Sequence, residues 1–134
     1  MKVIALAEIR GTDREVHCPQ GGFISYRFLL ARDGVGFSLH QTVVPKGPPQ
    51  HWHYAHHVEA CFCIAGHGIL TNRETNETFS IRPGVLYVLD QHDDHLFEAL
   101  EEVTFISVFN PPVMGKEVHD VNGSYPLSPL TPMC

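Results

Sequence analysis

The sequence predicts an all-β protein, a sandwich or barrel of short strands in a single domain that covers residues 1–134. Runs that alternate apolar and polar side chains recur along the chain, and clusters of turn residues separate them at short intervals. Beyond a short candidate helix at residues 3–10, no apolar stripe of helical period is sustained. A length of 134 residues, with 43% hydrophobic and 18% charged residues, is typical of one globular domain.

The expected elements follow one another with a break between successive strands. After the candidate helix, strands are expected at residues 24–31, 36–44, 58–65, 67–71, 78–82, 85–89, 95–100 and 103–110. The breaks consist of residue types that favour turns: Asp33-Gly34, Pro45 to Pro49, Gly66-His67-Gly68, Asn72 to Glu77, Pro83-Gly84, Asp90 to Asp94 and Glu101-Glu102. From Asn110 onward the chain is rich in proline, which predicts an irregular C-terminal segment wrapped on the barrel.

Successive side chains of a strand face opposite sides of a sheet, so residue parity predicts which groups point inward. If Glu59 points inward, so do Cys61 and Cys63, as small apolar groups. The side chains that alternate with them, Ala60, Phe62 and Ile64, then pack behind the strand. The same parity defines three further inward sets: Phe23, Ser25, Arg27 and Leu29; Val85, Tyr87 and Leu89; and Phe105, Ser107 and Phe109. Each set joins apolar groups with a polar one, which is typical of a small-molecule pocket.

Charge and cysteine usage argue against several classes of protein. The formal net charge is -6 without a run of lysine or arginine, so nucleic acid is not an expected partner. No apolar stretch is long enough to span a bilayer, and the N-terminal apolar stretch is too short for a secretory signal. The four cysteines, Cys18, Cys61, Cys63 and Cys134, are unevenly spaced, unlike a disulfide framework. We therefore expect a cytoplasmic protein without a membrane partner.

The stretch His51-Trp52-His53-Tyr54-Ala55-His56-His57-Val58-Glu59 concentrates four histidines and a glutamate. Neutral imidazole and carboxylate are ligand types that suit divalent iron, nickel, copper and zinc. The alternation after Glu59 indicates a loop that leads into a strand, where ligands can face a cavity. The alternative is a surface loop that is merely rich in histidine.

Two spaced motifs resemble those of cupins, which are small β-barrels of the jelly-roll type. Gly47-x3-His51-x-His53 followed by Glu59-x6-Gly66 is similar to the first motif. Pro83-Gly84-x2-Tyr87 is similar to the second, with tyrosine where many cupins carry histidine. The resemblance implies a cupin-type jelly-roll β-barrel. His53 and Glu59 are farther apart in sequence than is usual, so it stays open whether both histidines and Glu59 bind one metal ion.

Longer stretches resemble the ectoine synthase family within the cupins. They are Gly36 to His40, Tyr54 with His57 to Ala60, Leu86 to Asp90, Val108 to Pro112, Glu117 to Asp120, Asn122-Gly123 and Tyr125 to Leu127. With the barrel between them they extend over nearly the whole chain. The Phe-Asn-Pro-Pro stretch at 109–112 and the Glu-Val-His-Asp stretch at 117–120 are the most specific.

Ectoine synthases are dimeric cupins that close a ring in N-γ-acetyl-L-2,4-diaminobutyrate and expel water, which yields the osmolyte L-ectoine. The resemblance implies a metal-dependent hydro-lyase that forms a homodimer and acts on a small amino-acid derivative. It implies Fe(2+), or another divalent transition metal, held by Glu59, Tyr87 and His95. The implied substrate-binding residues are Phe23, Arg27, Thr42, Tyr54, Ser107, Phe109, Glu117 and His119, and Tyr54, Glu117 and His119 are also implied in catalysis.

Four positions that depart from the family pattern bear on the substrate. The family usually has tryptophan at the position of Phe23 and cysteine at that of Ser107. Phe23 keeps an apolar wall but lacks an indole N–H donor, and Ser107 keeps the size but lacks the soft sulfur. Ala65 and His67 stand where the family has two glutamates.

Each implied metal ligand has a plain structural alternative. A carboxylate on an apolar strand needs a partner, and for Glu59 the alternative to a metal ion is an ion pair with Arg27. Tyr87 becomes a ligand only when a cation withdraws its proton, and is otherwise an ordinary strand tyrosine. His95 competes with His92 in the acidic loop 90–95, and only the family resemblance favours His95.

Ring closure also needs a group for the substrate carboxylate and groups that transfer protons. Arg27 is expected to bind the carboxylate through its planar fork. Glu117 and His119 are the acid and base candidates, unless they form a salt-bridged surface turn.

Two rival functions stay open at this point. One is a different cupin enzyme, such as an iron-dependent dioxygenase, that uses His51 and His53 with Glu59. The other is a barrel that binds a small molecule without catalysing a reaction. If the histidines before Glu59 do not bind a metal ion, we expect them to line the cavity mouth or to orient Glu59 by hydrogen bonds.

Overall fold

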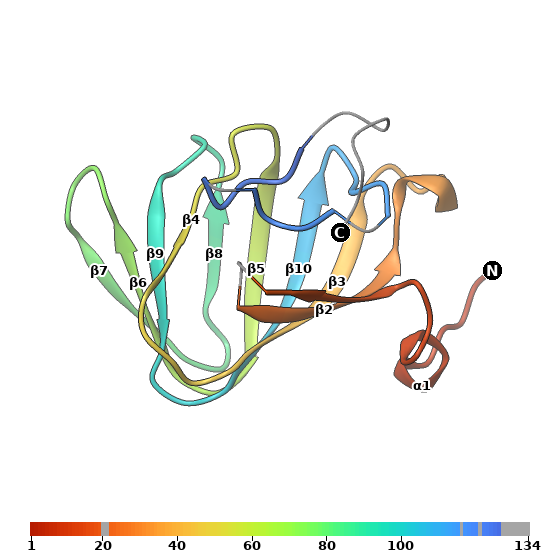
Figure 1. Cartoon of the computed structure of the whole chain (residues 1–134), viewed down its shortest axis with the longest axis horizontal. Helices are drawn as coiled ribbons and strands as arrows, with labels where there is room; N and C mark the ends of the chain where they lie inside the picture. Colours follow the sequence, from red (N-terminus) through yellow and green to blue (C-terminus); the bar gives the residue numbers. More distant parts are fainter. Residues whose placement is uncertain (20–21, 116, 121, 127–134) are drawn as a thin grey trace.

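The computed structural model describes residues 1–19, 22–115, 117–120 and 122–126. Two antiparallel sheets face each other, and the short helix α1 (Leu6–Ile9) lies beside them near the N-terminus (Figure 1). The strands are β1 (Glu15–Cys18), β2 (Phe23–Leu29), β3 (Ser38–Val44), β4 (Gln50–Trp52), β5 (Val58–Ala65), β6 (Gly68–Asn72), β7 (Thr78–Ile81), β8 (Leu86–Leu89), β9 (His95–Ala99) and β10 (Val103–Asn110).

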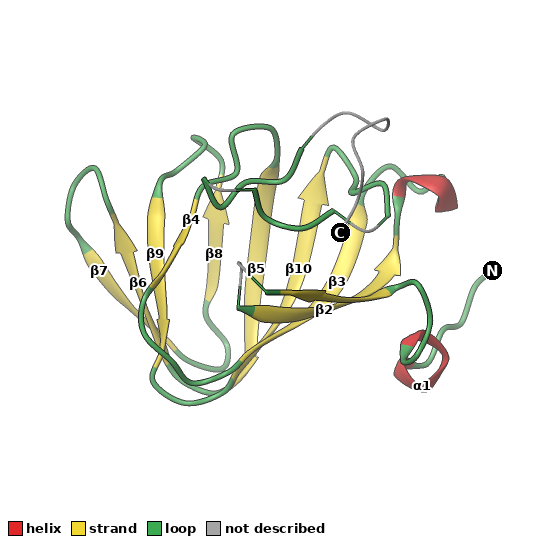
Figure 2. Cartoon of the chain, viewed as in Figure 1, coloured by secondary structure: helices red, strands yellow, loops and turns green. Residues whose placement is uncertain are grey.

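The sheets join strands that are distant in sequence. The larger sheet has the order β1-β2-β3-β10-β5-β8, and the smaller has the order β4-β9-β6-β7 (Figure 2). β10 lies between β3 and β5, so that Ser107 is opposite His40 on one side and Cys61 on the other. This register places the inward residues of three strands beside one another, and it confirms the prediction of an all-β sandwich.

All eight expected strands are present, and their bounds differ from the expected ones by at most two residues. The short β1 and β4 were not expected. β4 is the three-residue stretch Gln50-His51-Trp52, too short for its alternation to be recognised, and it exists because it pairs with β9. The helix is shorter than the expected 3–10, and residues 1–5 precede it without regular structure.

Residue parity holds along most strands and fails at one irregularity in β2. Phe23 and Arg27 are buried as expected. Between Arg27 and Leu29 the register of β2 against β3 shifts. An extra residue inverts the alternation, so Leu29 is only partly buried and Leu30 is 1% exposed. The expectation that Leu29 belongs to the inward set is therefore wrong.

The outer face of the larger sheet is apolar where β5 pairs with β8. Phe62 is opposite Leu86, and Ala60 is opposite Val88. Phe62, Leu86 and Val88 are 42%, 56% and 46% exposed, and Ile64 is 45% exposed. The expectation that Phe62 and Ile64 pack behind the strand is wrong for the isolated chain, because no described segment covers this face.

The segment after β10 crosses over one end of the sandwich (Figure 1). Gly123, with φ +72°, lies where a Cβ atom would be 2.3 Å from the carbonyl oxygen of His51, so only glycine fits this crossing. Its own carbonyl accepts the backbone N–H of His53 at 2.9 Å. The expected irregular C-terminal segment is thus seen at residues 111–115, 117–120 and 122–126, whereas Leu127 and the rest of the proline-rich end lie outside the described residues. None of the helices found in the described ranges could cross a membrane.

Candidate active site

A small cavity lies between the inner faces of the sheets, and it collects many of the polar groups expected to point inward. Its lining comes from both sheets and from the C-terminal segment: Phe23, Thr42, Trp52, Tyr54, Glu59, Cys61, Tyr87, Phe105, Ser107, Phe109 and Tyr125. Its volume is about 10 Å³, which is room for about one water molecule. A ligand of amino-acid size therefore enters only if lining side chains move.

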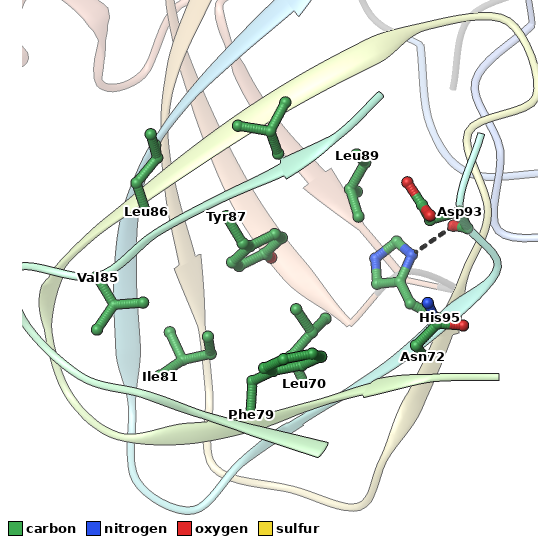
Figure 3. Close-up of a pocket in the computed structure, with 11 residues that line it drawn as sticks. Leu70, Asn72, Phe79, Ile81, Val85, Leu86, Tyr87, Leu89, Asp93 and His95 are labelled. Atoms are coloured by element: carbon green, nitrogen blue, oxygen red, sulfur yellow. Dashed lines mark hydrogen bonds between the residues drawn. The ribbon is translucent and has the colours of Figure 1, made fainter. Parts of the chain in front are cut away.

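A larger cavity of about 330 Å³ adjoins the first, lined largely by apolar groups of β6, β7 and β8. Figure 3 shows Tyr87 and His95 pointing into it from β8 and β9, among Leu70, Ile81 and Leu89. Tyr87 lines both cavities. Its phenol therefore lies at the boundary between the apolar cavity and the polar interior.

Glu59 is a carboxyl group in an almost water-free position. It is 5% exposed on the inner face of β5. Burial raises its pKa to about 8, although hydrogen bonds from Cys61 and Ser107 act in the opposite direction. Arg27 is not its partner, because no described ion pair includes Glu59. A positive charge beside this carboxyl would therefore be strongly favourable.

Tyr87 faces the same side of the sheet as Glu59, since Cys61 is opposite Tyr87 and Glu59 is opposite Leu89. The phenol is 9% exposed, and its hydroxyl finds no hydrogen-bond partner in the described part of the chain. Burial and the nearby Cys61 and Glu59 raise its pKa well above the usual value of 10. An ordinary half-buried strand tyrosine would keep its hydroxyl in water, so the position is unusual for a residue without a ligand.

His95 approaches from the opposite sheet, at the start of β9. Its Nδ1 lies 2.9 Å from the carbonyl oxygen of Asp93, and a carbonyl only accepts, so Nδ1 carries the proton. Burial lowers the pKa to about 4, which keeps the ring neutral. The lone pair of Nε2 is then available, and this buried atom has no partner among the described residues. His92, the competing histidine, is exposed and contacts the carbonyl oxygen of Tyr54.

Each of these three groups is a ligand type that suits a divalent metal ion. Two buried donor atoms without a partner, Tyr87 Oη and His95 Nε2, face the interior with a desolvated carboxyl, and oxygen and imidazole ligands suit iron. Over the described ranges, no three histidine, cysteine, aspartate or glutamate side chains are placed to hold a metal ion. The set His51, His53 and Glu59 is therefore not assembled as a metal site within these ranges.

The histidines before Glu59 have divergent surroundings. His51 is exposed and pairs with Asp94, which also binds Arg73. His56 is exposed as well. Only His57 is fully inside, at 2% exposure, where burial lowers its pKa to about 4. Its ring contacts Phe109 and Tyr125, with centroids 5.9 and 6.0 Å away.

Tyr54, which lines the small cavity, forms a buried pair with His119. The Tyr54 hydroxyl is 2.6 Å from His119 Nε2, and the two side chains are 3% exposed. Burial lowers the pKa of His119 to about 3 and raises that of Tyr54 well above 10, so both are uncharged near neutral pH. The pair holds one proton between two atoms that can each give or take it.

Glu117 and Arg27 organise the C-terminal segment. Both carboxylate oxygens of Glu117 accept backbone N–H groups, from Met114 at 2.5 Å and from Gly115 at 2.6 Å. Arg27 donates to the carbonyl oxygens of Gly115 (2.8 Å) and Glu117 (2.6 Å), and its Nη2 is 3.4 Å from the hydroxyl of Tyr125. Glu117 and His119 are 1% and 3% exposed, so they do not form a surface turn.

A hydrogen-bond chain extends from Arg27 to a histidine that the sequence analysis did not assign. Arg27 Nε donates to Ser25 Oγ at 3.1 Å, and this oxygen is 3.2 Å from His40 Nδ1. A guanidinium only donates, so Ser25 Oγ accepts from Arg27 and donates its own proton to Nδ1 of His40. Nδ1 is then the acceptor, and the neutral His40 ring carries its proton on Nε2. Nε2 is buried and without a partner in the described chain. Parity with Thr42 along β3 is the signal that places His40 inside.

The other expected substrate groups line the small cavity. Thr42 Oγ1 and Ser107 Oγ are 3.2 Å apart on neighbouring strands. Phe23 contacts His119 at 4.9 Å between centroids, and Phe109 contacts Tyr54 at 5.3 Å. Two departures from the family pattern, Ala65 and His67, instead lie at the turn between β5 and β6: Ala65 is exposed, and His67 contacts Ser80.

Two antiparallel sheets that enclose inward-facing polar groups, in this strand order, define a cupin-type barrel. The sequence profile of ectoine synthase matches residues 1–129. The L-ectoine synthase of Wolinella succinogenes is 49% identical over 120 residues, which cover 90% of this chain and 92% of the relative. That of Desulfatibacillum aliphaticivorans is 46% identical over 127 residues, 95% of this chain and 98% of the relative. The chain belongs to the ectoine synthase family.

Solved structures agree with this assignment. The crystal structure of ectoine synthase from P. lautus superimposes with a TM-score of 0.83 at 39% identity, covering 98% of this chain and 94% of that one. A putative ethanolamine utilization protein from Salmonella typhimurium superimposes with a TM-score of 0.62 at 14% identity, over 72% of this chain and 78% of that one. The second likeness concerns the fold alone.

Proposed function

We propose that this chain is a hydro-lyase that converts N-γ-acetyl-L-2,4-diaminobutyrate to L-ectoine by ring closure with loss of water. The relatives it matches over nearly their full length are L-ectoine synthases. The observation that carries the proposal is the buried set Glu59, Tyr87 and His95, which faces the interior beside the Tyr54–His119 pair. In the reaction the α-amine attacks the acetamide carbonyl carbon, and the carbonyl oxygen leaves as water.

Glu59, Tyr87 and His95 are the residues that would hold Fe(2+). When bound, the ion supplies a positive charge that polarises the acetamide carbonyl without a redox change. Glu59 is converted to a carboxylate in this role, because a cation offsets the desolvation that raises its pKa. His95 needs no such change, because its neutral tautomer already presents the Nε2 lone pair.

Arg27 provides positive charge for the substrate carboxylate. Fewer of its guanidinium N–H groups are free to bind that carboxylate than the sequence alone predicted. Four of its N–H groups are directed to Ser25, Gly115, Glu117 and Tyr125. One N–H on Nη1 and the positive charge are left for a ligand. We assign Arg27 to both roles, holding the C-terminal segment over the cavity and attracting the carboxylate.

The Tyr54–His119 pair transfers protons at the reacting centre. Ring closure moves two protons from the attacking nitrogen to the departing oxygen. For each of them, the Tyr54 hydroxyl donates a proton to the oxygen, which frees Nε2 of neutral His119 to accept a proton from the nitrogen, and that proton returns to Tyr54 across the 2.6 Å contact. Glu117 acts from the same segment, where its two backbone hydrogen bonds fix the position of His119. Phe23 and Phe109 exclude water, while Thr42 and Ser107 orient the folded substrate.

Incubation of the iron-loaded protein with N-γ-acetyl-L-2,4-diaminobutyrate, followed by NMR, tests the reaction. We expect the ring to form, and His119→Asn to lower kcat by roughly 100-fold to 10,000-fold, as loss of an acid–base group does. His17→Asn, a change at an exposed imidazole on β1, is the matched control and leaves kcat unchanged. Stabilisation by the substrate without turnover would instead indicate a non-catalytic binding barrel.

We further propose that the chain acts as a homodimer in the cytoplasm, with residues 1–134 as one domain. The apolar outer face at Phe62, Ile64, Leu86 and Val88 supports the dimer, because exposed patches of this kind are typical of protein interfaces. Sedimentation equilibrium tests it: a dimeric mass is expected, and a monomeric mass at micromolar concentration contradicts it.

A further inference from the structure

The indole N–H of Trp52 is a cavity group that neither the fold nor the proposed chemistry explains. It is 4% exposed and lines the small cavity with Glu59 and Tyr54. Its indole Nε1, a donor only, is buried without a hydrogen-bond partner in the described residues. Buried indole N–H groups usually have a hydrogen-bond partner. This one therefore either donates to a bound ligand or destabilises the fold by staying unpaired.

The rings around Trp52 are those that the proposed reaction uses. Its centroid is 5.6 Å from that of Phe23, 5.9 Å from His119 and 6.1 Å from His95, all edge-to-face. The indole therefore lies among the substrate wall, the proton-transferring histidine and a proposed metal ligand.

The ring is also held rigidly. It stacks on Phe97 with centroids 5.5 Å apart and planes 11° apart. Phe97 fits below it because Gly68 has no side chain, where a Cβ atom would be 2.4 Å from Phe97. Behind Trp52, Gly123 packs on its Cα, where a Cβ atom would be 2.9 Å away. A fixed donor costs little entropy when a ligand binds.

We propose that Trp52 is a substrate-binding residue whose indole N–H donates a hydrogen bond to an oxygen of the bound amino-acid derivative. This assignment rests on the proposed function, because it names a contact within the same site. It gives the short strand β4 a role that is chemical as well as structural: β4 carries the donor from the smaller sheet to the cavity, opposite the groups on β5 and β8.

Trp52 is the only tryptophan of the chain, so its fluorescence reports on the cavity directly. We expect N-γ-acetyl-L-2,4-diaminobutyrate, and separately L-ectoine, to shift the emission of the iron-loaded protein saturably, with a midpoint that matches their effect on the melting temperature. Unchanged emission while the melting temperature rises would overturn the role of Trp52 alone. If neither signal changes and no ring forms, the proposed function fails and this assignment fails with it.

Substitution separates the N–H from the ring. Trp52→Phe keeps an aromatic ring on Phe97, and we expect about a tenfold loss of kcat/KM, the value of one hydrogen bond, with no fall in melting temperature. Tyr26→Phe, which removes a polar group on the outer side of β2, is the matched control. Because Phe23 and Trp52 are in contact, Phe23→Trp/Trp52→Leu should restore part of the lost kcat/KM. An unchanged kcat/KM in Trp52→Phe, or a loss no smaller in the exchanged variant, contradicts the proposal.

Discussion

The histidine-rich stretch 51–57 contrasts with the buried set Glu59, Tyr87 and His95. Closeness in sequence does not predict burial in this protein. The stretch has four histidines within seven residues, yet His51 and His56 are exposed and only His57 is fully buried. The buried set is spread over 37 residues from position 59 to 95 and comes from three strands in two sheets. Its members all face the interior.

The difference teaches that strand geometry, more than local concentration, decides which groups face a common interior. Neighbouring residues of an irregular segment point in unrelated directions, so a dense run need not converge. Residues on the inner faces of opposed strands point into a shared interior, because the two sheets pack face to face. His51 accordingly pairs with Asp94 at the surface, while Glu59 is without an ion-pair partner among the described residues.

Removing one group from each region gives the largest expected contrast. Glu59→Ala should abolish iron retention after gel filtration and lower activity by more than roughly 100-fold, beyond what loss of an outer-shell partner costs. His53→Ala should keep the iron, because this residue is not part of the buried set. Metal analysis of the two variants checks this, and full iron occupancy in Glu59→Ala would end the assignment.

The pH dependence of metal-free stability is expected to follow with a smaller effect. Glu59 has a folded pKa of about 8, above the unfolded 4.5, so the metal-free fold loses stability as pH rises towards 8. His57, His95 and His119 have folded pKa values of about 4, 4 and 3, below the unfolded 6.5, so stability falls as pH drops below 6.5.

Between pH 6.5 and 8 Glu59 dominates, and urea titrations of the metal-free protein should show a loss of about 2 kcal/mol over this range. Glu59→Gln should remove the decline, because an amide does not titrate. Iron loading should remove it too. A decline of equal size in Glu59→Gln would assign it to another group.

The smallest effect is expected at the surface end of the histidine stretch. His51→Asn breaks the pair with Asp94 but leaves Arg73 in place. Exposed pairs contribute up to about 1 kcal/mol, so chemical denaturation should show a change within that limit, with iron content and activity unaffected. A loss of several kcal/mol would mean that the stretch is coupled to the interior after all.

Much of the fold could be predicted from the chain alone, because alternation and turn residues are local properties. β5 and β10 have the predicted bounds to the residue. β4 could not be predicted in this way, since three residues acquire strand geometry only through pairing with β9. The shift in β2 likewise depends on its partner β3, and it turned Leu29 away from the interior.

Some residues of the candidate site could likewise be predicted from the sequence, and others could not. Parity predicted that Glu59, Tyr87 and Ser107 point inward, but His95 could not be distinguished from His92 without the strand that begins at His95. Trp52 was not indicated by any pattern, because it lies on β4. Arg27 was expected to use its fork on a ligand, and the tertiary structure directs most of its donors to the C-terminal segment.

The amino-acid sequence by itself determined eight of the ten described strands, most of their inward faces and the family, because each depends on periodicity or on spaced motifs along one chain. Only the tertiary structure decided which buried polar atoms have no partner among the described residues, including Nε2 of His95, the phenol of Tyr87 and the indole N–H of Trp52. Whether a buried group has a hydrogen-bond partner depends on which atoms lie opposite it in the sandwich. The packing of the two sheets, which joins residues distant in sequence, decides which atoms those are.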